Sequence, residues 1–332
     1  MRKPDSAGRA LVRMEPSERQ VWCNRAAELG CPSEKIKNSD RITEVFPWST
    51  FVADEMKGQG LWDDAEEVKQ QKEVMLPVWA DDKRGLPNDL LRCNIFSATK
   101  IVDNKMVKKQ LMNTVDGVEI LYTGSLLDTY DLRVWEQLLH IARKKPLMSV
   151  CEFTAYEFLE AINVGTSAEK YEWLSNSFDR LMSGIVYVRK GKLTYGCGLV
   201  RTCLHDEETG KYKLILEDIL IDLFVKGGWT ALKLDHINNF RNKPLARWLN
   251  NYYATHAKPH PVKVATIMGL CGSKNKNLFS FRQQLKKALD ALIEANTIIE
   301  WSINDETDII SVIRGSYATL SQQRYLEKNA GK

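Results

Sequence analysis

The chain has 332 residues, with 47 Lys and Arg against 43 Asp and Glu and a formal net charge of +4. Its 44% hydrophobic and 27% charged residues exclude a wholly disordered chain, and its length suggests two or three domains. No apolar run approaches the ~18–20 residues of a membrane span, and the first residues lack a signal-peptide core, so we expect a cytoplasmic protein. Seven cysteines without a CxxC pair indicate reduced thiols rather than disulfides or a zinc site.

The charge is unevenly distributed along the chain. Residues 236–287 hold ten Lys and Arg and no Asp or Glu, so these 52 residues carry +10 and the other 280 carry −6. A solvated surface without a partner normally mixes both signs. A basic, acid-free block inside a folded region is instead typical of a surface that binds a polyanion, and we favour that interpretation.

The two ends of the chain differ from its middle. Residues 1–75 are predicted to form a partly helical, partly flexible N-terminal extension, with helical patterns at 17–29 and 62–75. Residues 321–332 form a C-terminal tail. Two folded domains are expected between them, at residues 76–218 and 219–320.

The first domain has the element order of a winged helix-turn-helix. Two strands, at residues 94–100 and 118–123, precede a helix at 128–145 whose apolar residues recur at three- and four-residue spacing. A short extended run, two helices and three strands follow, at residues 147–151, 155–163, 167–183, 185–192, 195–203 and 211–216. In winged helices, the third helix usually enters the major groove and the β-hairpin lies on the DNA backbone.

The second domain repeats this plan. Two short helical pieces at 222–226 and 232–239 precede a helix at 244–256, which Pro244 opens. A short strand, two helices and a hairpin follow, at residues 261–264, 264–271, 277–296, 298–304 and 308–314. The predicted fold class is therefore α+β, with tandem winged-helix (helix-turn-helix) domains and a partly helical N-terminal extension.

The last long helix and the turn before it carry the predicted DNA-binding site. One face of the helix is apolar, while a second face and the turn hold basic and amide side chains. Lysines and free helix N–H groups bind phosphates, and Arg and Gln can pair with guanine and adenine edges. The predicted contacts are Ser273, Lys274, Asn275, Lys276, Asn277, Ser280, Arg282, Gln283, Lys286 and Lys287, with Arg241 and Arg247 upstream.

The corresponding helix of the first domain is less basic. Its candidate contacts are Lys170 and Trp173, but Glu169, Glu172 and Asp179 accompany them. The hairpin that we predict as its wing adds Arg189, Lys190 and Lys192. The sequence leaves two interpretations open, backbone contact with limited base reading, or a helix that mainly packs the fold.

Four residue patterns that resemble enzymatic sites are better explained in other ways. His256 and His260 have no acid or cysteine beside them, and Pro259 interrupts a helix that would align them. Tyr252 and Tyr253 lack the histidine strand of a nicking enzyme. Glu217, Asp218 and Asp222 lie within an apolar connecting element, and the sequence around Gly272 lacks the glycine spacing of a nucleotide-binding loop. We expect a binding protein without catalytic residues, metal or cofactor.

Several strings resemble the TrfA family of plasmid replication initiators, in collinear order over roughly residues 76–315. They are Pro87-Asn88-Asp89, Leu121-Tyr122-Thr123-Gly124, Asp131 with Val134-Trp135-Glu136-Gln137-Leu138-Leu139, Ala142-Arg143-Lys144, and Leu270-Cys271-Gly272-Ser273 before the basic helix around Arg282. Some family members carry a sliding-clamp peptide before the Pro-Asn-Asp string. Here residues 73–79 lack its glutamine and terminal phenylalanine.

The resemblance implies a tandem winged-helix protein that binds directly repeated iterons in double-stranded DNA at a plasmid origin. It implies opening of an adjacent A+T-rich region, recruitment of the host initiator and replicative helicase, monomer–dimer self-association, and a part in plasmid copy control. The segment Ser273–Lys287 corresponds to the family's major-groove reader. Two rival hypotheses are a winged-helix transcriptional repressor and a rolling-circle nickase that uses Tyr252 or Tyr253.

Overall fold

A computed structural model describes residues 73–101, 105–114, 118–190 and 193–314. The described residues all belong to one compact unit, which begins at Glu73. Three predicted segments lie outside the described residues. They are the helix at 17–29, residues 62–72 of the helix at 62–75, and the tail at 321–332. No helix within the described ranges is long and apolar enough to cross a membrane.

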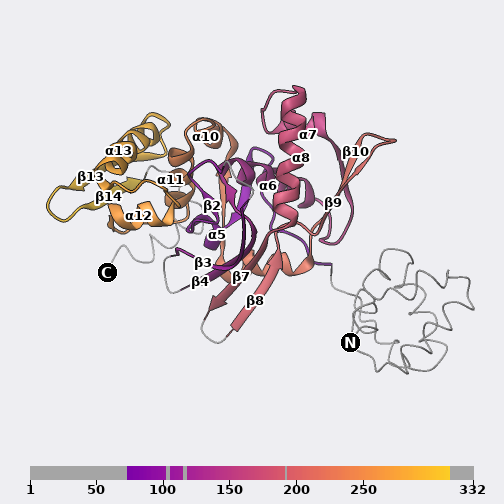
Figure 1. Ribbon diagram of the computed structural model, residues 1–332, viewed down its shortest axis with the longest axis horizontal. Coiled ribbons are helices and arrows are strands. Elements are labelled where there is room, and N and C mark those ends of the chain that lie inside the picture. The colour runs from indigo at the N-terminus through magenta and orange to yellow at the C-terminus, as the bar shows by residue number, and fades with distance from the viewer. Residues whose placement is uncertain (1–72, 102–104, 115–117, 191–192, 315–332) are drawn as a thin grey trace, which may run out of the picture. The chain divides into compact units, whose positions relative to one another are not determined.

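The described part is a mixed fold of helices and strands (Figure 1). A four-stranded antiparallel sheet has the order β3-β4-β7-β8 and is built from β3 (Met106–Met112), β4 (Glu119–Ser125), β7 (Ile185–Lys190) and β8 (Leu193–Gly198). Its inner face buries Ile120, Tyr122, Val186 and Val188. The parallel pair β2 (Phe96–Ser97) and β5 (Leu127–Asp128) lies beside α6 (Thr129–Ala142).

The first helical module runs from α6 to β10. Apart from the β7–β8 hairpin, which belongs to the four-stranded sheet, its elements follow the order helix, strand, two helices and hairpin. After α6 it comprises β6 (Cys151–Thr154), α7 (Ala155–Ala161), α8 (Ala168–Met182), β9 (Thr202–Asp206) and β10 (Lys211–Ile215), with the sheet order β6-β10-β9. Capping boxes at Asp128 and Thr154 begin α6 and α7. The hairpin β7–β8, which we predicted as the wing, instead pairs with β4, so that expectation was wrong.

The second helical module has the same order. It comprises α11 (Pro244–Ala254), β12 (Val262–Lys263), α12 (Val264–Leu270), α13 (Leu278–Glu294), β13 (Ile298–Asn304) and β14 (Ile309–Arg314), with the sheet order β12-β14-β13. In both modules the strand between the first two helices therefore pairs with the last strand. Figure 1 shows α7 and α8 at the opposite end of the described unit from α12 and α13.

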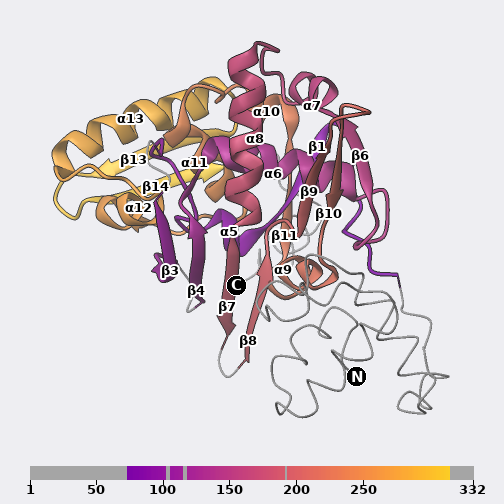
Figure 2. The same cartoon turned by 45° about the vertical axis from the view of Figure 1, so that its right-hand side comes forward.

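Short elements between the modules join them. They are β1 (Lys83–Pro87), α5 (Asn88–Leu91), the 3-10 helix η4 (Asp218–Leu220), α9 (Ile221–Gly227), β11 (Trp229–Lys233) and α10 (Leu234–Asn238). All five residues of β1 pair antiparallel with β11, from Lys83 opposite Lys233 to Pro87 opposite Trp229 (Figure 2). The predicted domain boundary after residue 218 is consequently bridged by a strand from the start of the first domain.

Each module has its own hydrophobic core. The first core includes Trp135, Phe158 and Phe178, and the second includes Phe281, Leu285 and Leu289 from the inner face of α13. The five cysteines within the described ranges are buried and free of disulfides, as their spacing predicted. The third helix of each module, α8 in the first and α13 in the second, packs one face on its core. The opposite faces of these two helices are the candidate sites.

Candidate nucleic-acid interface

The turn between α12 and α13 is built by its own small and polar residues. Gly272 adopts a φ of +66°, and its N–H and that of Ser273 donate to the carbonyls of Gly269 and Met268 at 3.1 Å each, which closes the end of α12. The Asn277 side chain accepts from the Ser280 N–H at 3.1 Å and so caps α13. Asn275 accepts from the Asn277 N–H at 3.0 Å. The two amide side chains that we predicted to contact DNA therefore shape the turn.

The first half of the described unit holds this turn in place. The hydroxyls of Ser97 and Thr99 donate to the Gly272 carbonyl at 3.0 and 3.2 Å, and the Ala98 N–H donates to the Cys271 carbonyl at 2.8 Å. A Cβ atom at Gly272 would lie 2.7 Å from Ser97 Oγ, so the close approach needs glycine. The amino end of α13 is thus fixed against the body of the protein.

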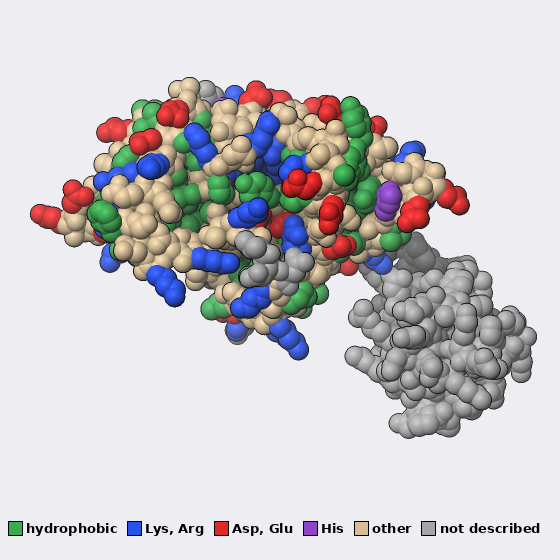
Figure 3. All heavy atoms as spheres, turned by 45° about the horizontal axis from the view of Figure 1, so that its top comes forward, with side chains coloured by type: hydrophobic (Ala, Val, Ile, Leu, Met, Phe, Trp, Pro, Cys, Tyr) green, Lys and Arg blue, Asp and Glu red, His purple; other side chains and the backbone are tan. Residues whose placement is uncertain are grey.

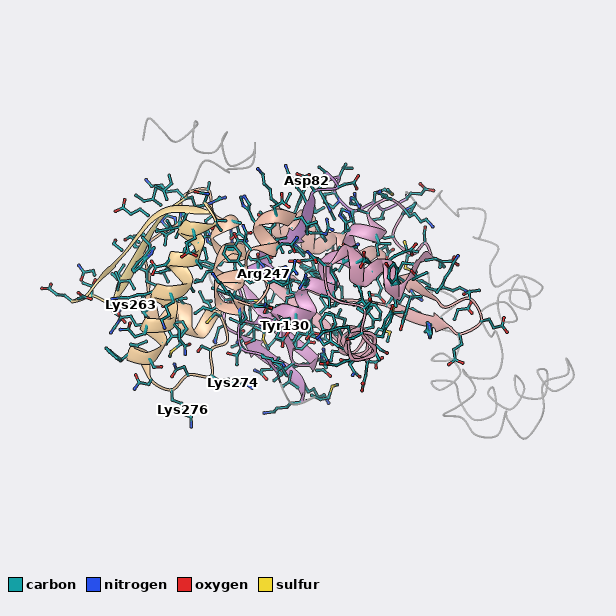
Figure 4. All side chains as sticks on the ribbon, turned by 90° about the horizontal axis from the view of Figure 1, so that it is seen from above. Asp82, Tyr130, Arg247, Lys263, Lys274 and Lys276 are labelled. Atoms are coloured by element: carbon teal, nitrogen blue, oxygen red, sulfur yellow. The ribbon has the colours of Figure 1, made fainter. Side chains whose placement is uncertain are left out.

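The outer face of α13 and its turn form the candidate interface. Phe279, Ser280, Gln283 and Lys287 are exposed along this face, and Lys286 is half-buried. Lys274 and Lys276 extend from the turn into solvent (Figure 4). Figure 3 shows Lys and Arg side chains gathered along the lower part of this view, with acidic groups more frequent along the upper margin and at both ends. Such an arrangement can bind phosphates through the lysines and present amides to base edges.

Arg282 has a different environment from the one that we predicted. Its Nε and Nη2 atoms donate to Asp308 Oδ1 at 2.9 and 2.6 Å, and its side chain is only 25% exposed. Asp308 lies immediately before β14, so this ion pair connects α13 to the hairpin β13–β14. In the free protein the Arg282 guanidinium thus positions the hairpin, and its donor groups face Asp308 instead of a base edge.

Arg247 is not at the interface, and the prediction for it was wrong. It is 3% exposed and forms a buried ion pair with Glu136 of α6, in the interior of the unit (Figure 4). Its charge neutralises a carboxylate rather than a phosphate, and it links α11 to the first module. Arg241 is half-buried in the turn before α11. The pKa of Arg133 is lowered mainly by burial, then by the charge of Arg247 and then by the charge of Arg241.

The first module offers a less favourable surface for DNA. Lys170 Nζ lies 3.9 Å from Glu169 Oε1, and Trp173 packs against the first core. Glu172 and Asp179 are exposed on α8, and the β9–β10 turn adds Glu207 and Glu208. This geometry favours the interpretation in which α8 mainly packs the fold.

The predicted wing residues of the first module are only partly described. Arg189 is exposed on β7, 3.8 Å from Glu119. The side chain of Lys190 and the whole of Lys192 lie outside the described residues. Arg189 belongs to the four-stranded sheet rather than to the β6-β10-β9 sheet, so it is placed away from the position that we expected.

The prediction missed a groove between the four-stranded sheet and α12. The groove has a volume of about 590 Å³ and is lined by Leu111, Met112, Asn113, Thr114, Val118, Glu119, Ala265, Thr266, Gly269 and Leu270. Asn113 crosses it and donates to the Gly269 carbonyl at 3.0 Å. On β3, Lys108 and Lys109 are exposed. The adjacent lysines in the sequence were the available signal, but the strand itself had not been predicted.

The two tyrosines that suggested a nicking enzyme are built into the second core. Tyr252 and Tyr253 are 4% and 3% exposed, and burial raises the pKa of the Tyr253 hydroxyl. His256 Nδ1 lies 2.9 Å from the Tyr252 carbonyl and 3.0 Å from Thr255 Oγ1. Among the described residues no three His, Cys, Asp or Glu side chains are grouped as a metal site.

The family model described as TrfA protein matches residues 58–312, well over half of the chain. The chain belongs to the TrfA family. This TrfA-family chain is similar to the plasmid replication initiator protein TrfA of Escherichia coli, with 26% identity over 253 residues, and the alignment covers 72% of the chain and 66% of that protein. The chain thus spans just under two thirds of the length of this relative.

Two solved structures of domains 2 and 3 of RctB are also similar to the TrfA-family chain. One has a TM-score of 0.46 and the other of 0.43, each with 11% sequence identity. The first covers 69% of this chain and 98% of the solved chain, and the second covers 66% and 95%.

Proposed function

We propose that this protein is a plasmid replication initiator that binds directly repeated iterons in double-stranded DNA. In this proposal the two helical modules are tandem winged-helix units, and α13 of the second unit enters the major groove. The observation that carries the proposal is the outer face of α13, where Phe279, Gln283 and Lys287 are exposed beside the turn lysines Lys274 and Lys276. Family membership and the name of the relative support the initiator role.

We propose further that binding promotes opening of the neighbouring DNA and recruits the host initiator and replicative helicase. No nucleotide site is required for this step, since the deformation of a bound duplex can supply part of the opening energy. Self-association between monomer and dimer would regulate access to the repeats. Membership of the TrfA family supports these activities.

The protein acts in this proposal as a binding protein and not as a nickase. A nicking tyrosine must approach a phosphodiester and lose its proton, whereas Tyr252 and Tyr253 are buried and the pKa of Tyr253 is raised. Incubation with supercoiled origin DNA and Mg²⁺ should leave no protein attached to DNA. A covalent protein–DNA adduct that resists denaturation would overturn this part of the proposal.

The function can be tested on the DNA that flanks the gene. Footprinting with the full chain should show protected direct repeats at a regular spacing, and a plasmid that contains only these repeats and the gene should replicate autonomously. Protection of the repeats with promoter silencing but without replication would instead establish the repressor. Absence of any protected sequence, both there and in a randomised duplex library, would refute DNA recognition.

A further inference from the structure

Phe279 is an apolar side chain in the first turn of the proposed recognition helix. It is 64% exposed, and it is the only phenylalanine or tryptophan with an exposed side chain in the described part of the chain. Burial of such a side chain normally stabilises a fold, so the free protein gains little from a phenylalanine here. Single exposed apolar side chains are common on protein surfaces, so exposure alone does not indicate a partner. The position of Phe279 at the start of the proposed recognition helix is what points to a contact with a bound molecule.

The surroundings of Phe279 indicate what kind of molecule that is. Gln283 lies four residues further along α13 and Lys287 four further again, so the three exposed side chains form one line along the helix. The buried face with Phe281, Leu285 and Leu289 points the other way. The next exposed apolar residue on the helix is Ile293, 14 residues away, which corresponds to about 21 Å. An isolated ring among lysines and amides does not form an apolar patch of the kind that binds a protein.

The major groove offers one apolar group to such a ring, the C5-methyl group of thymine. Arg282 is engaged by Asp308, so the exposed residues in the first turns of this face are Phe279, Ser280 and Gln283. A serine hydroxyl can pair with several base edges, whereas a glutamine pairs with the N6 and N7 atoms of adenine. We propose that Phe279 contacts a thymine C5-methyl group and that Phe279 and Gln283 together select A·T pairs in the binding site. This inference rests on the proposed function of α13 as a major-groove reader.

The test uses the full chain and removes only the methyl group from the DNA. A binding site is selected from a randomised duplex library, and each thymine in it is replaced in turn by deoxyuridine. We expect one replacement per bound site to weaken wild-type binding about fourfold, the effect of removing one buried methyl group. With Phe279→Ala the site should bind dT and dU duplexes equally at that position, while Phe279→Leu should keep a preference for dT.

Two controls separate this contact from general loss of binding. Gln283→Ala should lower affinity yet keep the dT preference, and Val225→Ala, at a 71% exposed position on α9, should change neither property. Equal binding of dT and dU duplexes by the wild type at every position overturns the inference, as does an unchanged dT preference in Phe279→Ala, and either result leaves DNA binding intact. If the wild type enriches no sequence from the library, the proposed function fails and the inference fails with it.

Discussion

The lysines of the α12–α13 turn provide the sharpest test of the proposed interface. Both Lys274 and Lys276 are exposed, and neither has an ion-pair partner among the described residues, so we expect each to bind one phosphate. Each phosphate contact contributes about 0.9 to the slope of log K against log salt. The double variant Lys274→Ala/Lys276→Ala should therefore have a slope about 1.8 shallower than the wild type.

The difference in slope can be measured as an affinity ratio. Between 50 and 200 mM salt, the wild type should lose about 12-fold more affinity than the double variant, as measured by fluorescence anisotropy on the selected duplex. Lys144→Ala/Lys145→Ala removes the same charge from exposed positions after α6, and its slope should match the wild type. Equal slopes for both double variants would show that the turn does not contact phosphates, and the interface would have to be placed elsewhere.

Three predictions concern how the unit is held together. Arg247→Ala should lower the free energy of unfolding in urea titrations by about 3–5 kcal/mol, because it leaves the Glu136 carboxylate buried and unpaired. The double variant Arg247→Met/Glu136→Leu leaves no unpaired charge and should lose less free energy of unfolding. An equal loss in the two variants would contradict this account. Gly272→Ala should lower the free energy of unfolding by at least about 1–2 kcal/mol, because of the positive φ and the close contact with Ser97. A wild-type midpoint of urea unfolding would refute the need for glycine at this contact. Burial, together with Arg84 and Arg143 beside the ring, lowers the pKa of His140 to about 3. The unfolded chain therefore takes up a proton first as the pH falls below 6.5, and the free energy of unfolding should drop by up to about 1.4 kcal/mol per pH unit. His140→Gln should flatten this pH dependence.

Local patterns predicted the helices of both modules well. The helices predicted at 128–145 and 155–163 are observed as α6 and α7, and the apolar spacing of α13 identified its buried face. Such features depend on residues within one or two turns of each other, so they can be read from a single sequence. The order of elements in the second module followed from these patterns, whereas in the first module the wing was assigned to the hairpin β7–β8 instead of β9–β10.

The long-range features could not be predicted in this way. The strands β1 and β11 have five residues each, too few to show a clear period, and each pairs with a partner far away in sequence. Charge counting placed Arg247 in the interface because it registers a basic residue but not its partner, and Glu136 is 111 residues away. The ion pair of Arg282 was missed for the same reason, since Asp308 is 26 residues away in the sequence.

The pairing of β1 with β11 has a consequence for synthesis of the chain. Lys83 leaves the ribosome 150 residues before its partner Lys233, a delay of roughly 8–30 s at about 5–20 residues per second. During this time the edge of β1 has no partner strand, and over the last part of the interval the helices of the first module, which end at Met182, have already been synthesised. The nascent protein therefore exposes a strand edge that can pair with another β-segment, and a chain that ends before Trp229 lacks the partner strand for that edge.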